Sequence, residues 1–156
     1  MTERTPGGNG DRGLGTLESE TELAARLRLA VTRLSRRLRQ QVAGGVTPSQ
    51  VSALATIERL GSPTLGELAA SEQVRPPSMT RIVVGLEGAG LVTRRVDADD
   101  RRVARVMLSA EGRRVVQRSR SLRTAFLARR LRRLSTPERE ALGELVALLE
   151  RLVEEG

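Results

Sequence analysis

Three capping boxes of the form Ser/Thr-x-x-Glu/Gln divide the chain into helices, and no other sequence feature constrains its fold as strongly. In such a box, the hydroxyl of the first residue and the side chain of the fourth satisfy backbone amides that a helix leaves unpaired in its first turn. The boxes begin at Ser19, Thr47 and Thr64. They predict a first helix that ends at Gly44-Gly45, a second that ends at Gly61-Ser62-Pro63, and a short third from Leu65 to about Ala70.

A fourth helix is predicted to begin at Pro76-Pro77, because proline fits the first turn of a helix, where the amide donors have no partners. This helix is expected to stop at Gly88-Ala89-Gly90. Its apolar residues fall on one face at helical spacing and are expected to be buried: Met79, Ile82, Val83 and Leu86.

Beyond this helix the period of the apolar residues changes. Residues 91–96 and 103–108 are short, β-branched and broadly alternating, which predicts two strands joined by a hairpin loop at 97–102. Ser109 is predicted to cap a long helix, and a last helix is predicted to start at Thr136-Pro137-Glu138.

This order of elements predicts a mainly α-helical protein with a small β-hairpin, the pattern of a winged helix-turn-helix. We expect a single domain at 19–154, with the winged helix at 47–112 and flanking helices at 19–44 and 109–154, after a disordered Gly-rich tail at 1–18. A generic small α+β domain with solvated arginines is the alternative. The tail contains Gly8-x-Gly10-x-x-Gly13, the spacing of a dinucleotide-binding loop, but no strand precedes it, so we interpret the match as coincidence.

The composition excludes several classes of chemistry. Histidine and cysteine are absent, so the chain cannot form disulfides, thiolate nucleophiles, Ser–His–Asp triads or the usual Cys/His zinc sites. The acidic residues Asp97, Asp99 and Asp100 lack the glycine and distal glutamate of a calcium-binding EF-hand loop. We therefore expect no enzymatic activity, no cofactor and no metal ion.

The charge balance points to a polyanionic partner. The formal net charge is +8, and every basic residue is arginine, whose planar fork of donors matches phosphate oxygens and guanine edges. Proteins that bind single strands stack bases on aromatic rings, and Phe126 is the one aromatic residue in the chain. Double-stranded DNA is therefore the expected partner. No apolar stretch reaches the roughly 20 residues of a membrane span, and the N-terminus lacks the apolar core of a signal peptide, so we expect a cytoplasmic protein without membrane contact.

The chain resembles the MarR family of bacterial transcriptional regulators over about residues 19–154. The motifs that carry the resemblance are Leu68-Ala69-Ala70, Pro77-Ser78-Met79-Thr80-Arg81-Ile82-Val83, Leu86-Glu87-Gly88-Ala89-Gly90-Leu91-Val92, Asp97-Ala98-Asp99-Asp100-Arg101-Arg102 and Leu108-Ser109-Ala110-Glu111-Gly112. The resemblance implies that Arg102 reaches the DNA minor groove from the wing and that Ser78, Thr80 and Arg81 face the major groove. It also implies a homodimer of interlocked terminal helices, and a pocket for a small-molecule effector whose residues cannot be named from the resemblance.

The candidate DNA contacts follow from the winged helix, whose second helix inserts its N-terminal residues into the major groove while an arginine of the wing enters the minor groove. On the recognition helix they are Arg75, Pro77, Ser78, Thr80 and Arg81. On the wing they are Arg94, Arg101 and Arg102, with Asp100 orienting the neighbouring arginines.

The terminal helices carry more apolar surface than one winged helix can cover, which predicts a partner surface on a second copy of the chain. The expected dimerisation residues lie on the last helix: Leu142, Leu145, Leu149 and Leu152. An intramolecular helical bundle is the alternative. As a whole, the sequence predicts a ligand-responsive repressor that binds a pseudo-palindromic operator as a homodimer, with an architectural DNA-binding protein of low sequence specificity as the alternative.

Overall fold

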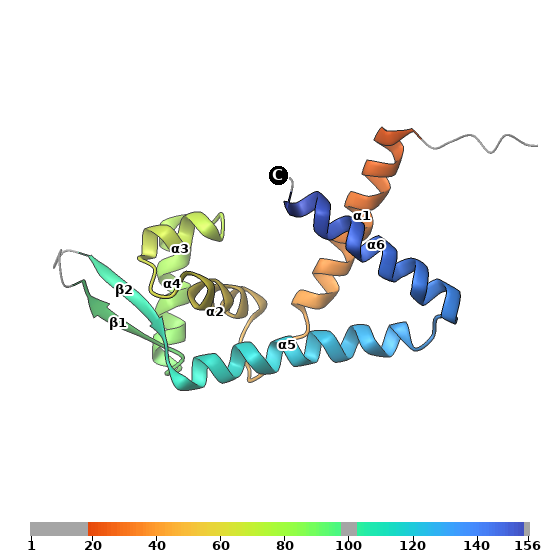
Figure 1. Ribbon diagram of the computed structural model, residues 1–156. Helices are drawn as coiled ribbons and strands as arrows, with labels where there is room; N and C mark the ends of the chain where they lie inside the picture. The colour runs from red at the N-terminus through yellow and green to blue at the C-terminus, as the bar shows by residue number, and fades with distance from the viewer. Residues whose placement is uncertain (1–18, 98–102, 155–156) are drawn as a thin grey trace, which may run out of the picture. The chain divides into compact units, whose positions relative to one another are not determined.

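A computed structural model describes residues 19–97 and 103–154 of the chain. By its internal contacts the chain divides into two compact units, residues 1–35 and 36–156. The described part of the first unit is most of one helix, and the second unit holds the end of that helix and all other elements. In chain order the elements are α1 (Glu20–Arg39), α2 (Pro48–Leu60), α3 (Leu65–Ser71), α4 (Pro76–Gly88), β1 (Val92–Val96), β2 (Ala104–Leu108), α5 (Ala110–Leu131) and α6 (Thr136–Glu154), as labelled in Figure 1.

All three predicted capping boxes form. At the start of α1, the Ser19 N–H donates to Glu22 Oε2 at 3.0 Å, and the Glu22 N–H donates to Ser19 Oγ at 3.2 Å. The same reciprocal pair joins Thr47 to Gln50 at α2 and Thr64 to Glu67 at α3. A fourth box, which we did not predict, begins at Ser135 and starts α6. The hydrogen bonds lower the pKa of the three capping glutamates because they favour the charged carboxylate: Glu22, Glu67 and Glu138.

The prediction that Gly44-Gly45 ends the first helix was wrong. The helix α1 ends at Arg39, and the N–H of Gln41 then donates to the carbonyl of Leu38 in a turn. Both glycines have positive φ, 73° and 70°, and lie in the link that leads to α2. Gly61, in contrast, caps α2 as predicted: its φ is 84° and its N–H donates to the carbonyl of Ile57. A pair of glycines thus marks left-handed backbone without fixing how far upstream the helix stops.

The core of the second unit lies between α2, α3, α4, the hairpin and the first turns of α5. Of the four residues predicted to form the buried face of α4, Met79, Val83 and Leu86 are buried and Ile82 packs half-buried against them. The fully buried large side chains of the core are Leu54, Ile57, Leu68, Met79, Leu86, Val51, Val83, Val92, Val106 and Val116. This single aliphatic cluster fixes which face of α4 is turned outward.

The hairpin pairs β1 with β2 in antiparallel register, with Val92 opposite Leu108 and Val96 opposite Ala104. Val92 and Val106 point into the core, while the other residues of β2 are half-buried and those of β1 are exposed except for the half-buried Arg94. The predicted strands were right to within a residue at each end.

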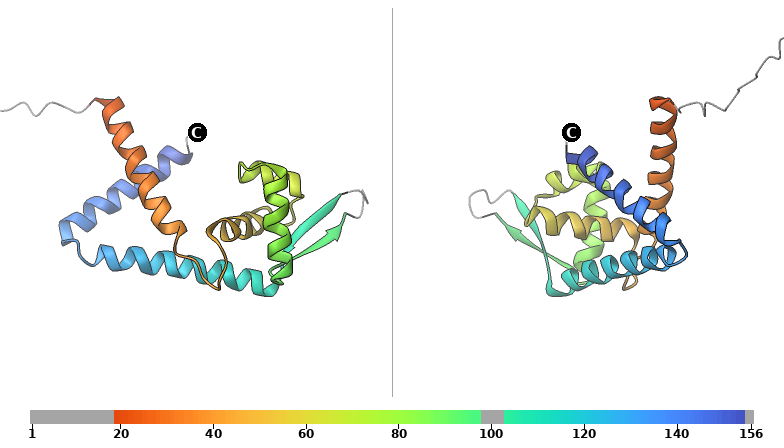
Figure 2. Two further views of the ribbon diagram at one scale, coloured as in Figure 1. Left: turned by 180° about the vertical axis from the view of Figure 1, so that it is seen from behind. Right: turned by 45° about the vertical axis from the view of Figure 1, so that its right-hand side comes forward.

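Gly112 forms the junction between the hairpin and α5. Ser109 caps this helix, with its Oγ accepting from the Gly112 N–H at 3.0 Å and donating to the carbonyl of Gly90 at 2.7 Å. A Cβ on Gly112 would lie 2.0 Å from the carbonyl oxygen of Leu91, so a residue without a side chain is required here. From this junction α5 passes along α2, with which it is in contact, and Figure 2 shows the same course from two further sides.

The two terminal helices α1 and α6 bury none of their described side chains. On α6, Leu152 and Val153 are 62% and 81% exposed, whereas Leu142 and Leu149 are half-buried. Together the elements form a mainly helical winged helix-turn-helix with additional N- and C-terminal helices, which confirms the predicted fold class. No helix within residues 19–97 and 103–154 has the length and apolar character needed to cross a membrane.

Candidate nucleic-acid interface

The helices α3 and α4 pack against each other and form a helix-turn-helix. Backbone hydrogen bonds shape the turn, since the N–H of Gln73 donates to Ala70 and that of Val74 to Ala69. Gln73 adopts a φ of 53°, the one positive φ among the described non-glycine residues. In such a motif the second helix lies in the major groove, so α4 is the candidate recognition helix of this chain.

The outward face of α4 carries all five predicted DNA contacts of the recognition helix. Arg75, Pro77, Ser78, Thr80 and Arg81 are exposed, and burial of the opposite face holds them there. Arg75 also occupies the N-cap position without a side-chain capping bond, so its guanidinium is not used to start the helix.

No acid within the described part of the chain pairs with the arginines on this face. Within residues 19–97 and 103–154, Arg75 and Arg81 form no ion pair or side-chain hydrogen bond, whereas the hydroxyl of Thr80 donates back to the carbonyl of Pro76 at 3.0 Å. Two exposed guanidinium groups near the N-terminal end of a helix match the donor pattern that phosphates and guanine edges accept.

The predicted wing residues divide into two groups. Arg94 lies on β1 with its Nε 3.0 Å from Oε2 of Glu87 on α4, so it has an acidic partner that the sequence did not indicate. Arg101, Arg102 and Asp100 lie outside the described residues. The hydrogen bond next to residues 98–102 joins the two described residues that flank them: the N–H of Asp97 donates to the carbonyl of Val103 at 2.8 Å.

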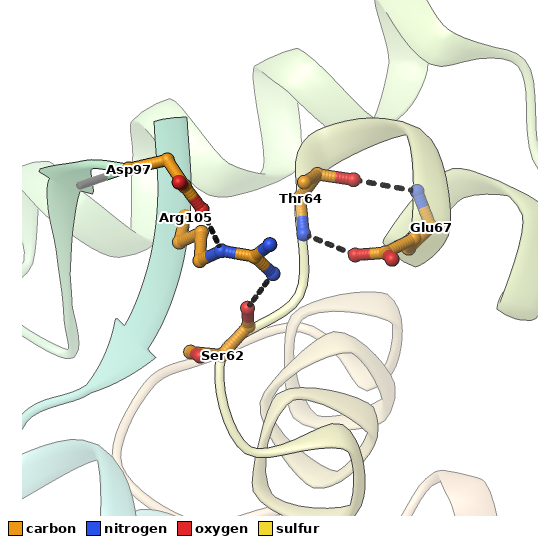
Figure 3. Close-up of polar contacts among 5 residues, drawn as sticks. All are labelled: Ser62, Thr64, Glu67, Asp97 and Arg105. Atoms are coloured by element: carbon orange, nitrogen blue, oxygen red, sulfur yellow. Dashed lines mark hydrogen bonds and ion pairs between the residues drawn. The ribbon is translucent and has the colours of Figure 1, made fainter. Parts of the chain in front are cut away.

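Arg105 on β2 is a polar residue of this region that we did not predict (Figure 3). Its Nε donates to Oδ2 of Asp97, and its NH1 donates to the carbonyl of Ser62 at 3.1 Å. The hydrogen bonds from Thr64 lower the pKa of Glu67, and the nearby positive charge of Arg105 lowers it further. These contacts join the hairpin to the turn between α2 and α3.

Polar contacts also join α2 to its neighbours. Oε2 of Glu58 lies 2.5 Å from NH2 of Arg120 on α5. The Thr56 hydroxyl donates to Glu72, at the end of α3. On α5, the fully buried Ser119 accepts a hydrogen bond from the N–H of Ala43 at 3.3 Å. The helix-turn-helix and α5 are therefore linked through α2.

Three residues that matter for this architecture were missed from the sequence: Arg105, Gly112 and Ser119. Gly112 was noted only as part of a family motif, although its place three residues after a capping serine marks the first turn of a helix. Ser119 falls three and four residues after Val116 and Val115, on the apolar face of α5, and that position was a readable signal of burial. The reach of Arg105 to Ser62 had no signal in the sequence, because it depends on the fold.

No group of three or more acidic residues within the described part of the chain is arranged to hold a metal ion. The predicted dimerisation residues Leu142, Leu145, Leu149 and Leu152 lie on α6, where Leu145 and Leu152 are exposed and the other two are half-buried. The sole aromatic ring, that of Phe126, is buried, and the guanidinium of Arg130 covers it at 3.5 Å from the ring centroid.

Comparisons with known proteins agree with this geometry. The family model described as "MarR family" matches residues 46–104. An HTH-type transcriptional regulator of Mycobacterium tuberculosis is 42% identical over 140 residues, which cover 89% of this chain and 98% of the relative. The HTH-type transcriptional repressor MdtR of Bacillus subtilis is 32% identical over 110 residues, 70% of this chain and 71% of the relative. Among solved structures, a Pseudomonas aeruginosa protein described as a transcriptional regulator superposes with a TM-score of 0.74 at 40% identity, covering 88% of this chain and 99% of that one.

Proposed function

Because the chain belongs to the MarR family of HTH-type transcriptional regulators, we propose that it binds duplex DNA as a homodimer at a pseudo-palindromic operator. It is a DNA-binding regulator and not an enzyme. The observation that carries the proposal is the outward face of α4, on which two arginines without an ion pair among the described residues are exposed together with two hydroxyl side chains. The guanidinium groups and the Ser78 hydroxyl can donate to phosphates and to base edges in a major groove, and Thr80, whose hydroxyl donates to Pro76, can accept a hydrogen bond there.

The proposed contacts differ in what they read. Arg81, with Ser78 and Thr80, reads base edges in the major groove, and Arg75 and Pro77 lie where the helix meets the DNA backbone. From the wing, Arg101 and Arg102 enter the minor groove, and Asp100 orients them. Arg94 is the weakest member of this set, because Glu87 already neutralises its guanidinium.

The homodimer is supported by the uncovered apolar side chains of α6. Fully burying a large aliphatic side chain stabilises by about 1.5–3 kcal/mol. Because Leu142 and Leu149 are already half-buried and Leu145 and Leu152 are partly covered, a partner surface would gain only part of that amount at each leucine, before the costs of association. The proposed occupant of this surface is a second copy of the chain. Two α4 helices in a symmetric dimer then read half-sites about one helical turn apart.

We also propose that the protein is a ligand-responsive repressor. Its similarity to MdtR, a repressor by name, supports the direction of regulation. A cavity of about 280 Å³ in the second unit supports a small effector, close to the lower end of the size range of ligand pockets. It is lined by Arg39, Pro48, Ser49, Ser52, Glu72, Val74, Met79 and Ile82. A ligand there touches the inner side of α4 at Met79 and Ile82, and so can favour one orientation of the recognition helix.

The alternative function is an architectural DNA-binding protein, which the net charge of +8 favours because a large positive charge binds any duplex. The two functions differ in how much more tightly the protein binds one operator than random duplex, and not in whether it binds DNA.

Selection of bound fragments from random duplex DNA distinguishes them. We expect the purified protein to enrich one pseudo-palindrome and to bind it at least about 10³-fold more tightly than random duplex at physiological salt. Arg81→Ala should lose this enrichment, and Arg118→Ala, which removes the same charge from an exposed position on α5, should retain it. Strong salt-sensitive binding without enrichment of any sequence would establish the architectural protein instead.

A further inference from the structure

The side chain of Arg105 connects the hairpin to the turn at the start of the helix-turn-helix. The guanidinium of Arg105 uses its fork of donors in two directions, toward Asp97 near the tip-side end of the hairpin and toward the Ser62 carbonyl in the α2–α3 turn (Figure 3). Ser62 and Arg105 are 43 positions apart in the sequence. The contact is therefore a tertiary one, between the element that starts the helix-turn-helix and the element that carries the wing.

The backbone beside Arg105 makes the same connection. Thr64 and Arg105 form an isolated antiparallel bridge, and the N–H of Val106 donates to the carbonyl of Pro63 at 2.8 Å. Residues 62–64 thus lie along the free edge of β2. Because Thr64 is also the N-cap of α3, the hairpin is attached at the first residue of the helix-turn-helix.

Charge and burial favour a fixed side chain at this position. The Asp97 side chain is only 12% exposed, and burial strengthens its attraction to the guanidinium. Arg95 lies directly opposite Arg105 in the strand register, so two positive charges face each other across the hairpin. Directly opposed like charges are unfavourable, and the carboxylate of Asp97 offsets that repulsion.

We propose that Arg105 is a positioning residue for DNA binding: with Asp97 and the Ser62 carbonyl it fixes the angle at which the hairpin leaves the α2–α3 turn. This inference rests on the proposed function, because the angle matters only if α4 and the wing meet one duplex together. Arg105 acts through the wing and does not itself contact DNA. The two strands of the hairpin are then held at one angle to α4 before DNA binds, which lowers the ordering cost of binding.

The first test measures the free protein. Arg105→Gln removes the charge and the fork, and Arg95→Gln removes the same charge from the exposed residue across the strand pair. Amide hydrogen exchange of the two hairpin donors, the N–H groups of Asp97 and Val106, should be at least about tenfold faster in Arg105→Gln. In Arg95→Gln, exchange of these two amides should be unchanged. In both variants, exchange of the amides in the core of α2 should also be unchanged. Unchanged exchange in Arg105→Gln would overturn the inference, whether or not the protein binds an operator.

The second test is a double-mutant cycle on the selected operator. Arg105→Gln should weaken binding about tenfold in the natural chain and less than about twofold when Arg102→Ala has already removed a proposed wing contact. Equal losses in both backgrounds, together with a salt slope reduced by about one, would mean that Arg105 contacts a phosphate directly and would overturn the positioning role. Arg105→Lys, which keeps the charge but not the fork, should recover only part of the affinity. Faster exchange combined with no operator at all would retain the anchoring of the hairpin and refute the proposed function.

Discussion

The winged-helix part of the chain, residues 47–112, and the terminal helices α1 and α6 use similar apolar side chains in opposite ways. In the winged helix, Leu54, Ile57 and Leu86 are completely buried within one chain. On α6, Leu145 and Leu152 remain 43% and 62% exposed. The core of the first region is completed within the same chain, with Val115 and Val116 of α5 closing it, whereas α1 and α6 bury none of their described side chains. The difference indicates that one region can be stable in a single chain, whereas the other requires a second surface.

The polar contacts differ in the same way. In the winged helix, ion pairs and hydrogen bonds join separate elements, such as Glu58 with Arg120 and Arg105 with Ser62. In α6 they are local, at Ser135, Glu138 and Arg139 near its start. Long-range polar contacts specify one arrangement of elements, and local contacts specify only that a helix forms. Substitutions or truncations confined to the winged helix or to α6 can test this contrast.

Removal of residues 136–156 should have the largest effect on DNA binding. The truncated chain loses the whole apolar face of α6 and should sediment as a monomer or aggregate through its exposed leucines. A monomer contacts one half-site, so operator affinity should fall at least about 100-fold while weak, salt-sensitive binding to any duplex persists. Analytical ultracentrifugation and operator titration measure the two effects. A truncated protein that remains dimeric and binds the operator with full affinity would place the interface elsewhere.

Gly112→Ala should cause the largest loss of stability from one methyl group. The new Cβ would lie 2.0 Å from the carbonyl oxygen of Leu91, and backbone on both sides must shift, at a cost of about 2–3 kcal/mol. Denaturant unfolding measures this loss. The control is Gly66→Ala in α3, where a Cβ meets only Thr64 Oγ1 at 3.9 Å and should stabilise by about 0.5–1 kcal/mol. Equal stability of the two variants would show that α5 and the hairpin do not meet so closely.

Arg81→Ala and Arg102→Ala should weaken DNA binding in different ways. If Arg81 contacts a base edge, its loss costs about 1–3 kcal/mol at the operator and little on random duplex. Loss of a minor-groove arginine at 102 should weaken binding to all sequences and reduce the salt slope by about one. Titration of operator and random duplex at several salt concentrations separates the two. Identical effects on both duplexes would refute the assignment of roles.

Glu67→Gln should have the smallest effect, because glutamine can still complete the capping box with Thr64. What is lost is the carboxylate charge of Glu67. The hydrogen bonds from Thr64, and after them the positive charge of Arg105, hold the pKa of this carboxyl below its usual value. A lowered carboxyl pKa contributes stability above the unfolded pKa and loses it as the pH falls through the folded value. The variant should therefore melt slightly below the natural protein at pH 7, and the difference should disappear at a pH low enough to protonate Glu67 in the folded protein. A difference that persists at the lower pH would assign the effect to the cap itself.

Sequence reasoning reached the fold because its signals are local. A capping box, a pair of prolines and a change of apolar period each act within a few residues, and they located α2, α3, α4 and both strands. The outward face of α4 followed once its apolar residues were assigned to the core. The end of α1 was misplaced because glycine reports backbone conformation at its own position, and α1 stops earlier, at Arg39.

The contacts of Arg105 with Asp97 and Ser62 could not be predicted in the same way. Whether Arg105 meets Asp97 depends on strand register, and whether it meets Ser62 depends on how the hairpin packs beside a turn much earlier in the chain. The role of Gly112 likewise depends on the path of Leu91. Such contacts exist only after the elements have assembled, so an arginine in a basic sequence gives no sign of them.

The unbroken course of α5 makes it a lever between the two regions. Its 22 residues span about 33 Å at about 1.5 Å per residue. Because Val115, Val116 and Ser119 are buried and Arg120 pairs with Glu58, the first half of α5 and the winged helix must move together. A tilt of about 5° moves the far end of α5 by about 3 Å relative to Gly112, close to the rise of one base pair. In the proposed homodimer, a small displacement at the far end of α5 would therefore reach the hairpin as a rotation.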